Sequence, residues 1–414
     1  MTVPRDDHER TFADRLLQSP TEPAFESPDH YVWGADVVRG PDGRYHLFAA
    51  RWPHDAGPFN DAWGTDSEIV RATADTPVGP FSLAETVVEP WAHNPEILRI
   101  EDRYVLYYLG PGWEVHVLVA EQPTGPWTHH ETGIGAPANP AAAVRDDGTI
   151  VLIIKQADDE LGRRYDCYLA EEIAGPYELA NEQVFSPAPT GPTEDMTIWN
   201  AGGFFHLVSN WGPKADFSAT EGFHALSRDG VEWQVPERAD AFSLEVEYDD
   251  GSVTDFGDGG SLERVKVYAP GGTATHMYRA VAPEGKGGAT PASNTWSMVT
   301  PLRRPLSVEI ETAGADPGGI DLDADEAMRV SVSHPEISPD RIDAGSLRAG
   351  AVDAVNDGRG ARPTAVAATD AGLTLRVPTT DLGFEATSID YLLKVVGEAV
   401  GGEFLSGHER VEIA

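Results

Sequence analysis

Short strand-like runs recur along the first three quarters of the chain. Four of them alternate apolar and polar residues with the two-residue period of a strand that buries one face, over 67–74, 115–121, 165–171 and 222–228. Three are followed by the same Gly-Pro-aromatic turn, in 76–82, 122–128 and 172–178, and the fourth by a degenerate copy in 227–234. The first three turns begin 46 and 50 residues apart (122 minus 76, and 172 minus 122), a period typical of propeller blades.

A second pattern consists of an apolar pair, a short turn and an aromatic strand. It occurs five times, over 36–48, 96–108, 142–154, 196–208 and 265–278. Together with the Gly-Pro-aromatic edge, the two patterns give about four short strands per unit, as in a propeller blade. A β-sandwich also has many short strands, but it would not repeat the same turn chemistry five times. The sequence therefore predicts an all-β fold in which residues 31–305 form a five-bladed β-propeller.

The repeats stop near residue 305, where the composition shifts to Ala, Gly, Asp and Val without any tryptophan. Strand-like pieces follow in 327–334, 373–382, 388–397 and 408–414. They predict a small Ig-like β-sandwich over residues 306–414 with a structural role. Residues 1–30 precede the first repeat and are expected to form an N-terminal extension.

The charge of the chain narrows the classes of partner. Acidic residues outnumber basic ones 68 to 30, which gives a formal charge of −38 spread along the whole chain. Such a charge repels nucleic acid and anionic membrane surfaces, so neither is expected as a partner. Adaptation to a high-salt environment, where ions screen the repulsion within about 3 Å at molar strength, is the favoured explanation over an acidic interaction surface.

Cysteine content and hydropathy indicate a compartment. Cys167 is the single cysteine, so no disulfide can form within the chain, and its strand-like run is typical of a packed thiol. The first 20 residues contain no apolar signal-peptide core, and no stretch reaches the roughly 18 apolar residues of a membrane span. These features predict a cytoplasmic protein, and they do not indicate an oligomeric state.

Polar residues stand at the start of each repeated strand, where the first strand of a propeller blade opens onto the central shaft. Aligning the copies places 33–36, 93–96, 139–140, 194–195 and 263–264 at this point. An Asn-Pro pair is by itself a turn signal, because proline restrains the residue before it. Several carboxylates, a histidine, an arginine and tryptophans at one mouth are better explained by a site. Glu194 and Asp195 are therefore expected to point into the shaft.

The same segments resemble a known family. Residues 33–52, 66–82, 93–110, 193–199 with 222–233, and 262–278 resemble, in order and spacing, the five-bladed glycoside hydrolases related to family 43 and the sucrase-like branch near it. The resemblance covers residues 30 to 302. It implies a five-bladed propeller that acts on carbohydrate with carboxylic acid catalysis.

The resemblance assigns roles residue by residue. Family 43 uses a Glu at the start of a blade as general acid, and Glu194 matches it, with the adjacent Asp195 expected to raise its pKa. The family's general base corresponds to Gly34 in this chain, so Asp36, two residues later on the same strand face, is the substitute. The third family carboxylate corresponds to Asn139, which is an amide.

These departures leave alternatives open. Glu194 is the expected acid, and Asp36, or else Glu263 or Glu68, is the expected base; the full catalytic set is Asp36, Glu68, Glu194, Asp195 and Glu263. Glu68 and Glu263 also match motifs of the sucrase-like branch. A separation of roughly 6.5 to 9.5 Å between acid and base would leave room for a water molecule and predict inversion at the anomeric carbon. The rival functions are a non-catalytic carbohydrate-binding propeller, and a lyase or phosphorylase on the same fold.

Sugar recognition requires flat aromatic faces for the ring and polar groups for the hydroxyls. The candidates for this carbohydrate contact are Trp33, Arg51, Trp52, Trp63, His93, Asn94, Trp113, Asn139, Trp211 and Arg264. No His, Cys and Asp spacing is diagnostic of a metal site, so no metal ligand and no cofactor is assigned. The resemblance nevertheless allows for a cation bound in the shaft.

Overall fold

The protein is all-β, as the sequence predicts, and its sheets are small and almost entirely antiparallel. The computed structural model describes residues 11–135, 138–156, 164–185, 193–211, 221–311, 319–322, 327–384 and 389–413. The chain divides into two compact units. The larger comprises Leu17–Trp233 and Ala241–Leu302, and the smaller comprises Met1–Leu16, Gln234–Asp240 and Arg303–Ala414.

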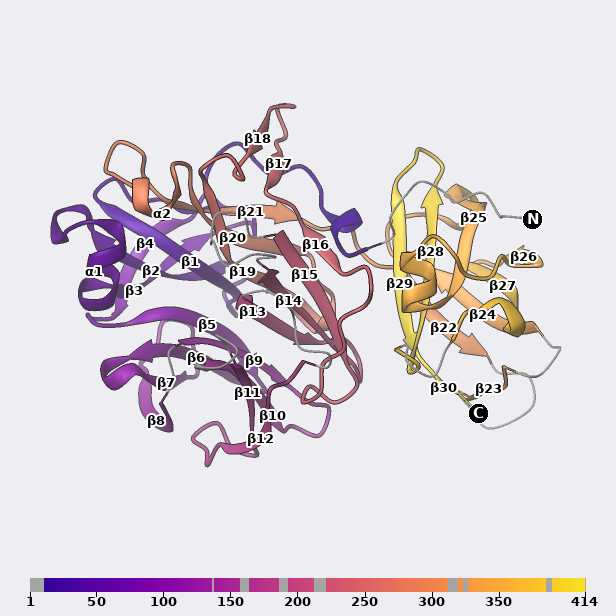
Figure 1. The fold of residues 1–414 in the computed structure, drawn as a ribbon, viewed down its shortest axis with the longest axis horizontal. Helices are drawn as coiled ribbons and strands as arrows, with labels where there is room; N and C mark the ends of the chain where they lie inside the picture. The colour runs from indigo at the N-terminus through magenta and orange to yellow at the C-terminus, as the bar shows by residue number, and fades with distance from the viewer. Residues whose placement is uncertain are drawn as a thin grey trace. The chain divides into compact units, whose positions relative to one another are not determined.

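The larger unit is built from five antiparallel sheets that follow one another along the chain (Figure 1). The first contains β1 (His30–Arg39), β2 (Tyr45–Pro53), β3 (Glu68–Ala74) and β4 (Ser82–Val88), and the second β5 (His93–Ile100), β6 (Arg103–Gly110), β7 (Glu114–Ala120) and β8 (Thr128–Gly135). The third contains β9 (Ala138–Val144), β10 (Ile150–Gln156), β11 (Arg164–Ala170) and β12 (Glu178–Glu182), and the fourth β13 (Thr193–Asn200), β14 (Phe205–Trp211), β15 (Glu221–Ser227) and β16 (Asp240–Phe242). The fifth contains β19 (Ser261–Tyr268), β20 (His276–Ala282) and β21 (Trp296–Pro301), after a hairpin of β17 (Glu245–Glu247) and β18 (Val253–Asp255).

The repeated sequence patterns form the same strands in each sheet. The four alternating runs are the third strands β3, β7, β11 and β15, and the aromatic runs are the second strands β2, β6, β10, β14 and β20. The Gly-Pro-aromatic turns connect the third strand to the fourth in the first three sheets. The strands predicted from these patterns are therefore confirmed.

The first strands of the five sheets close a ring. β1 packs against β5 and β19, β9 packs against β5 and β13, and β13 packs against β19. In Figure 1 these strands lie toward the middle of the unit, whereas β4, β8 and β12 lie at its periphery. Apolar residues of neighbouring sheets fill the space between them, as where Val37 and Leu47 meet Tyr278, and where Val117 meets Leu152. Burial of these faces from water stabilises the arrangement of the sheets.

The N-terminal segment completes the fifth sheet, which has three strands of its own. Phe25 and Ser297 of β21 form an antiparallel bridge with both backbone hydrogen bonds, at 2.8 and 3.2 Å. Further along the same edge, the Leu17 N–H donates to the Pro301 carbonyl oxygen at 2.9 Å. The start of the chain therefore pairs with the outer strand of the last sheet.

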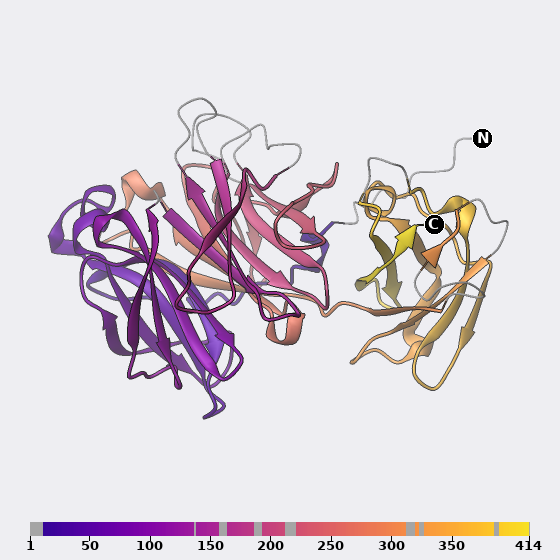
Figure 2. The same cartoon turned by 90° about the horizontal axis from the view of Figure 1, so that it is seen from below.

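The smaller unit contains two antiparallel sheets that share one core (Figure 2). One sheet has the order β22 (Ser307–Glu311), β24 (Ala327–Ser333), β27 (Leu373–Pro378) and β26 (Ala365–Ala368), and the other the order β25 (Ile342–Ala351), β28 (Leu392–Ala399) and β29 (Phe404–Arg410). A short parallel pair joins β23 (Gly319–Ile320) to β30 (Glu412–Ile413), and α3 spans Val352–Asn356. Val330 and Leu375 of the first sheet belong to the same buried cluster as Leu347 and Val395 of the second. The strands expected within 327–334, 373–382 and 388–397 are confirmed.

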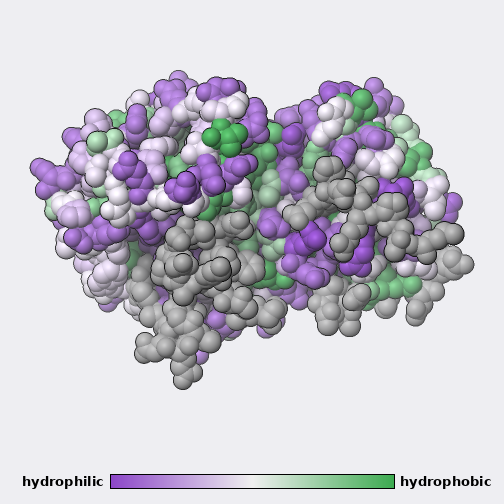
Figure 3. Space-filling model, turned by 45° about the horizontal axis from the view of Figure 1, so that its top comes forward, coloured by the Kyte–Doolittle hydropathy of each residue, from purple (hydrophilic) through white to green (hydrophobic). Residues whose placement is uncertain are grey.

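Hydrophilic residues are abundant on the face drawn in Figure 3. Cys167 is fully buried in β11, where burial raises the pKa of its thiol to about 12, so it is a packed, inert group. Within the ranges that the structure describes, no helix is long and apolar enough to cross a membrane.

Candidate active site

The second residue of the repeated leading segment has a left-handed backbone in all five first strands. Gly34, Asn94, Asn139, Asp195 and Arg264 have φ between 54° and 76°, and the pairing with the second strand shifts register at each of these positions. Glycine, asparagine and aspartate tolerate this conformation best, whereas at Arg264 it costs energy. Because a bulge re-aims side chains away from the regular alternation, these five residues can face one another. We call them the second-position ring.

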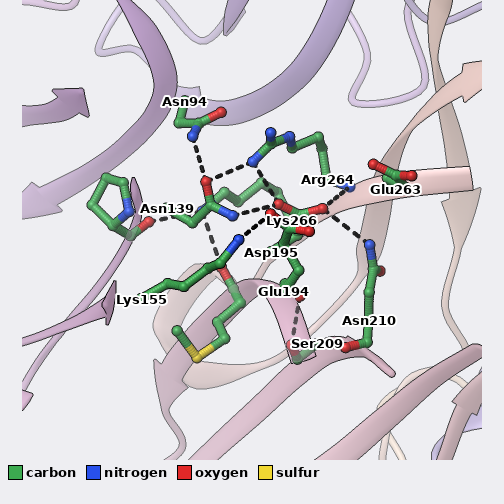
Figure 4. Close-up of polar contacts among 12 residues, drawn as sticks. Asn94, Asn139, Lys155, Glu194, Asp195, Ser209, Asn210, Glu263, Arg264 and Lys266 are labelled. Atoms are coloured by element: carbon green, nitrogen blue, oxygen red, sulfur yellow. Dashed lines mark hydrogen bonds and ion pairs between the residues drawn. The ribbon is translucent and has the colours of Figure 1, made fainter. Parts of the chain in front are cut away.

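Asp195 is the centre of the second-position ring (Figure 4). Its Oδ1 accepts hydrogen bonds from Asn139 Nδ2 at 2.8 Å and from Arg264 Nη1 at 2.5 Å. Its Oδ2 accepts from Asn210 Nδ2 at 3.0 Å and from the Arg264 backbone N–H at 3.1 Å. Four donors therefore occupy the lone pairs of this buried carboxylate, so that it orients its neighbours in the ring.

The ring lines a cavity and leaves polar atoms without protein partners. Asn139 Oδ1 accepts hydrogen bonds from Asn94 Nδ2 and, at 2.6 Å, from Arg264 Nη1. In the described part of the chain, the buried atoms Asn94 Oδ1, Asn210 Oδ1 and Arg264 Nε have no hydrogen-bond partner. Asn94 and Arg264 both line the cavity, together with Gly34, Ala35, Pro95, Asn139, Pro140, Asp195, Met196 and Lys266. Unpaired buried donors and acceptors favour a ligand with hydroxyl groups, since hydroxyls both donate and accept.

Two carboxyl groups stand at the first leading position, one residue before the ring. Lys155 of β10 donates a hydrogen bond to Glu194 of β13, and the two form an ion pair. Lys286, in the short helix α2 (Gly285–Gly288), lies with Nζ 2.8 Å from Glu263 Oε2. The Glu194 side chain is 23% exposed and that of Glu263 is 7% exposed, so the pair spans the border between water and the interior.

Glu263 is the carboxyl group of this pair that is suited to hold a proton. Burial raises its pKa, the Lys286 ammonium opposes that shift, and the charges of Asp195 and Glu194 add to it. A carboxyl group with a raised pKa can remain protonated nearer neutral pH and donate its proton. Glu194 is the more exposed of the two and forms its ion pair with Lys155.

A deeper set of residues occupies the fourth leading position, and we call it the inner layer: Asp36, Glu96, Ala141, Thr197 and Lys266. Here side chains accept backbone N–H groups of the next sheet. Asp36 accepts from Ile97 at 2.8 Å, Glu96 from Ala142 at 3.0 Å, and Thr197 from Val267 at 3.2 Å. These contacts tie each first strand to its neighbour.

Asp36 therefore lies in a different environment from the one the resemblance suggested. Its second oxygen accepts the Val37 N–H at 2.8 Å, so both carboxyl oxygens bind backbone groups. Burial, followed by repulsion from Glu96, raises its pKa to about 8, and the Lys266 ammonium offsets only part of that shift. A carboxyl group held in this way is suited to a structural role. Asp36 was expected to replace the base because residues two apart share a strand face, but its contacts do not favour that role.

Lys266 places an ammonium group among oxygens of three other first strands. It forms an ion pair with Glu96, and its Nζ donates to the carbonyl oxygens of Pro140 at 3.2 Å and Met196 at 3.1 Å. The sequence allowed for a cation in the shaft, and this lysine supplies a positive charge there. Among the described residues, no group of three or more His, Cys, Asp or Glu side chains is arranged to hold a metal ion.

Arg51 in β2 lies one strand away from the first strand β1, and Glu68 in β3 lies two strands away. Arg51 Nε donates to Glu68 Oε1 at 2.7 Å, and Thr86 Oγ1 donates to Glu68 Oε2 at 3.2 Å. Arg51 pairs with Val32 across β1 and β2, and with Glu68 across β2 and β3. Both charges are thus matched within the first sheet.

The aromatic candidates divide into buried and accessible residues. Trp33 and Trp52 are at most 2% exposed and pack with Phe59 in one apolar cluster, so they do not offer a free face to a sugar. Trp63 is partly buried and lies 4.9 Å from the His93 ring, whereas Trp113 is 46% exposed. The side chain of Trp211 lies outside the described residues.

His93 is fully buried at the first leading position of β5. Its Nδ1 lies 2.8 Å from Ser67 Oγ, and burial, followed by the nearby Arg264 charge, lowers its pKa well below the usual value. The imidazole is therefore neutral at physiological pH and acts as a packed hydrogen-bonding group beside Trp52 and Trp63.

The residues that sequence reasoning missed are mainly lysines. The chain contains five lysines, and three of them, Lys155, Lys266 and Lys286, each pair with a carboxylate of a first strand. In a chain with an acid excess of 68 to 30, this scarcity was a usable signal, because arginine supplies nearly all other positive charge. Asn210 of β14 had no such signal.

Comparison with known proteins gives structural neighbours. No family model and no curated protein matches the chain. The catalytic domain of a family 62 α-L-arabinofuranosidase from Coprinopsis cinerea is 12% identical, with a TM-score of 0.52 over 70% of this chain and 98% of that one. CoXyl43, a family 43 β-xylosidase/α-arabinofuranosidase from a compost microbial metagenome, is 12% identical, with a TM-score of 0.50 over 72% of this chain and 97% of that one.

Sequence identities this low support a shared fold and nothing finer. They confirm the fold resemblance inferred from the sequence motifs. The larger unit of this chain shares the fold of the glycoside hydrolases of families 43 and 62, which are five-bladed β-propeller enzymes.

Proposed function

We propose that this protein is a glycoside hydrolase whose catalytic carboxyl groups are Glu194 and Glu263. The observation that carries the proposal is their placement. They occupy the same leading position on neighbouring first strands, and each directly precedes a residue that lines the cavity. Burial raises the pKa of Glu263, and the charge of Glu194 adds to that shift. Two carboxyl groups in different protonation states are what glycoside hydrolysis requires.

In the mechanism we propose, Glu263 donates its proton to the oxygen of the leaving group. Glu194, which is ion-paired with Lys155, removes a proton from the water that attacks the anomeric carbon. The bond from that carbon to the leaving oxygen breaks while the bond to water forms, and the product has inverted stereochemistry. The family resemblance gives the acid role to Glu194, and the contacts of the two residues favour the reverse assignment.

The other predicted carboxylates have supporting roles in this proposal. Asp195 fixes the second-position ring, Asp36 ties the first sheet to the second, and Glu68 neutralises Arg51. The second-position ring, with its unpaired Asn94 and Arg264 atoms, would contact the sugar hydroxyls.

The domain assignment belongs to the same proposal. We infer a five-bladed propeller over residues 31–305 and an Ig-like β-sandwich over 306–414, with residues 1–30 as an extension. The ring of five first strands supports the propeller, and the two sheets around one core support the sandwich. We assign the sandwich a structural role. A high-salt, cytoplasmic setting remains our expectation from the composition.

The test is a glycoside screen in molar salt, starting with the β-xylosides and α-L-arabinofuranosides that the names of the structural neighbours suggest. We expect Glu263→Gln to lose about 10²- to 10⁴-fold in kcat/KM on a sugar leaving group and much less on a dinitrophenyl leaving group, which needs no protonation. Glu194→Ala should lose as much kcat/KM on both kinds of leaving group. Added azide should restore its turnover, and NMR should show that the product has inverted stereochemistry.

Glu68→Gln is the matched control, since it removes another paired carboxylate that begins a strand, and it should retain activity. Full turnover in both Glu194→Ala and Glu263→Gln would overturn the catalytic assignment. Affinity for oligosaccharides without turnover of any glycoside would favour the binding-propeller alternative, which is supported by Gly34 where family 43 has its base.

A further inference from the structure

Three connections at one end of the first two sheets each carry a tryptophan. In antiparallel sheets the β2–β3, β4–β5 and β6–β7 connections all lie at the end where β1 and β5 begin. Trp63 is in α1 (Phe59–Asp66) of the first connection, Trp91 lies two residues before β5, and Trp113 ends the short helix η3 (Pro111–Trp113). The topology therefore brings all three to the end of the unit that holds the second-position ring.

These indoles contact one another in a fixed arrangement. The ring centroids of Trp63 and Trp113 lie 5.7 Å apart at an interplanar angle of 89°, and those of Trp91 and Trp113 lie 4.9 Å apart. Trp91 Nε1 donates a hydrogen bond to the Trp63 carbonyl oxygen at 2.9 Å, which orients its ring. Packed rings of this kind lose little conformational freedom when a ligand binds, which favours binding.

Trp113 is the member of the group that faces water. Its 46% exposure places it among the few exposed large apolar residues of the described chain. Its backbone has φ of 58°, a conformation that is costly for a bulky residue and that tends to be retained at functional sites. Trp113 packs against two indoles, but leaving nearly half of it exposed in a strained turn is unfavourable for folding alone, which favours a ligand on its exposed face.

One buried residue, His93, separates the tryptophan group from the lining of the cavity. The Trp63 ring lies 4.9 Å from His93, and the next residue, Asn94, belongs to the second-position ring and lines the cavity. The two proposed catalytic carboxyl groups come from β13 and β19, in the fourth and fifth sheets. One part of the site thus carries ionisable groups and another carries flat apolar faces.

We infer that Trp63, Trp91 and Trp113 form a platform that stacks against a sugar residue outside the bond that is cleaved. This inference rests on the proposed glycosidase function and specifies its substrate as an oligosaccharide rather than a simple glycoside. The apolar C–H face of a sugar ring matches the face of an indole, while its hydroxyls remain in water at the exposed side of Trp113.

The test compares Trp113→Ala and Trp113→Phe with the wild type on xylo- and arabino-oligosaccharides of two to five residues and on the corresponding 4-nitrophenyl monoglycosides. We expect Trp113→Ala to reduce kcat/KM about 10- to 100-fold on the longer oligosaccharides, through KM, and to change it less than twofold on the monoglycosides. Trp113→Phe should recover most of the loss. Trp127→Phe, in a Gly-Pro-aromatic edge, is the control and should leave kcat/KM unchanged on both the oligosaccharides and the monoglycosides.

Equal losses on short and long substrates, or no loss on either, would overturn the platform and leave the glycosidase proposal intact. If no glycoside is turned over, quenching of tryptophan fluorescence by xylopentaose or arabinopentaose is measured instead. Quenching that disappears in Trp113→Ala would support the platform while the glycosidase proposal fails. Absence of quenching by either sugar in the wild type would then reject the platform.

Discussion

The second-position ring and the inner layer lie two residues apart on the same five strands, yet their carboxylates have different environments. Asp195 in the ring is held by side-chain amides, a guanidinium and one backbone N–H, and it borders residues that a ligand can reach. Asp36 in the inner layer binds backbone N–H groups of two strands, and the two carboxylates are similarly buried, at 6% exposed for Asp36 and 3% for Asp195. The identity of the donors therefore distinguishes an acid that organises a site from one that holds sheets together.

The lysines also divide into one that holds the sheets together and one at the edge of the site. Lys266 is 12% exposed and bridges four of the five first strands, while Lys286 is 31% exposed and contacts Glu263 at the edge of the site. Removing charge from the inner layer should therefore affect folding, and removing it from the edge should affect catalysis. The following variants test that separation.

The largest effect is expected for Lys266→Met. It leaves the buried Glu96 carboxylate without its counter-charge and two carbonyl oxygens without their donor, and breaking a buried pair costs about 3–5 kcal/mol. Chemical denaturation in molar salt would measure this as a lower midpoint. A loss as small as that of Lys286→Met would contradict the assignment of Lys266 to the inner layer.

Asp36→Asn should destabilise by a smaller amount. An amide can accept only one of the two backbone N–H groups that Asp36 binds, and a buried N–H without a partner costs about 1–3 kcal/mol. Activity on glycosides should persist in the folded variant, because Asp36 is not placed as the base. Loss of all turnover in a stable Asp36→Asn protein, with azide rescue of Asp36→Ala, would restore the base role to Asp36.

The pH dependence of stability gives a third comparison. Since the pKa of Asp36 is raised to about 8 in the folded state, above the ordinary value of about 3.9, the folded protein holds a proton that the unfolded chain has lost. The free energy of unfolding should therefore fall as pH rises from about 4 to about 8, and this contribution is lost above the folded pKa. Asp36→Asn should flatten this slope, so its destabilisation is smaller at pH 9 than at pH 6.5. An unchanged pH dependence of stability in Asp36→Asn would contradict the raised pKa of Asp36.

The smallest effect on stability is expected for Lys286→Met, about 0–1 kcal/mol, because that pair is partly exposed. Its effect should appear in the pH profile instead. The ammonium lowers the pKa of Glu263, so its removal should move the basic limb of kcat/KM to higher pH if Glu263 donates the proton. A shift toward lower pH would mean that Glu263 is not the proton donor.

Much of the fold could be predicted because each sheet repeats the same turn and strand chemistry. The residues Gly34, Asn94, Asn139 and Asp195 also contained a signal for the bulges, since these residue types favour a positive φ. Arg264 did not, because its left-handed conformation depends on contacts with Asp195. Local sequence thus specified four of the five ring positions.

The burial and the contacts of a side chain were harder to predict than the strand face on which it lies. The two-residue period places Asp36 on the same face as Gly34, but it does not say that two backbone N–H groups would engage the carboxylate. Trp33 in β1 and Trp113 in the β6–β7 connection were likewise both expected to contact sugar, and their packing makes one a core residue and the other an exposed one. Ion partners such as Lys155 depend on residues far away in the chain.

The bridge between Phe25 and Ser297 has a consequence for how the protein is made. The two residues are 272 positions apart (297 minus 25), so a growing chain on the ribosome cannot form this contact until nearly three quarters of it has been synthesised. Until then the edge strand β21 does not exist, and residues 17–27 have no partner there. Closing so long a loop carries an entropic cost and slows folding. Pairing of residues 17–27 with β21 should therefore be a late step of folding. Until then the unpaired strand edge is exposed, and chaperones would have to protect it.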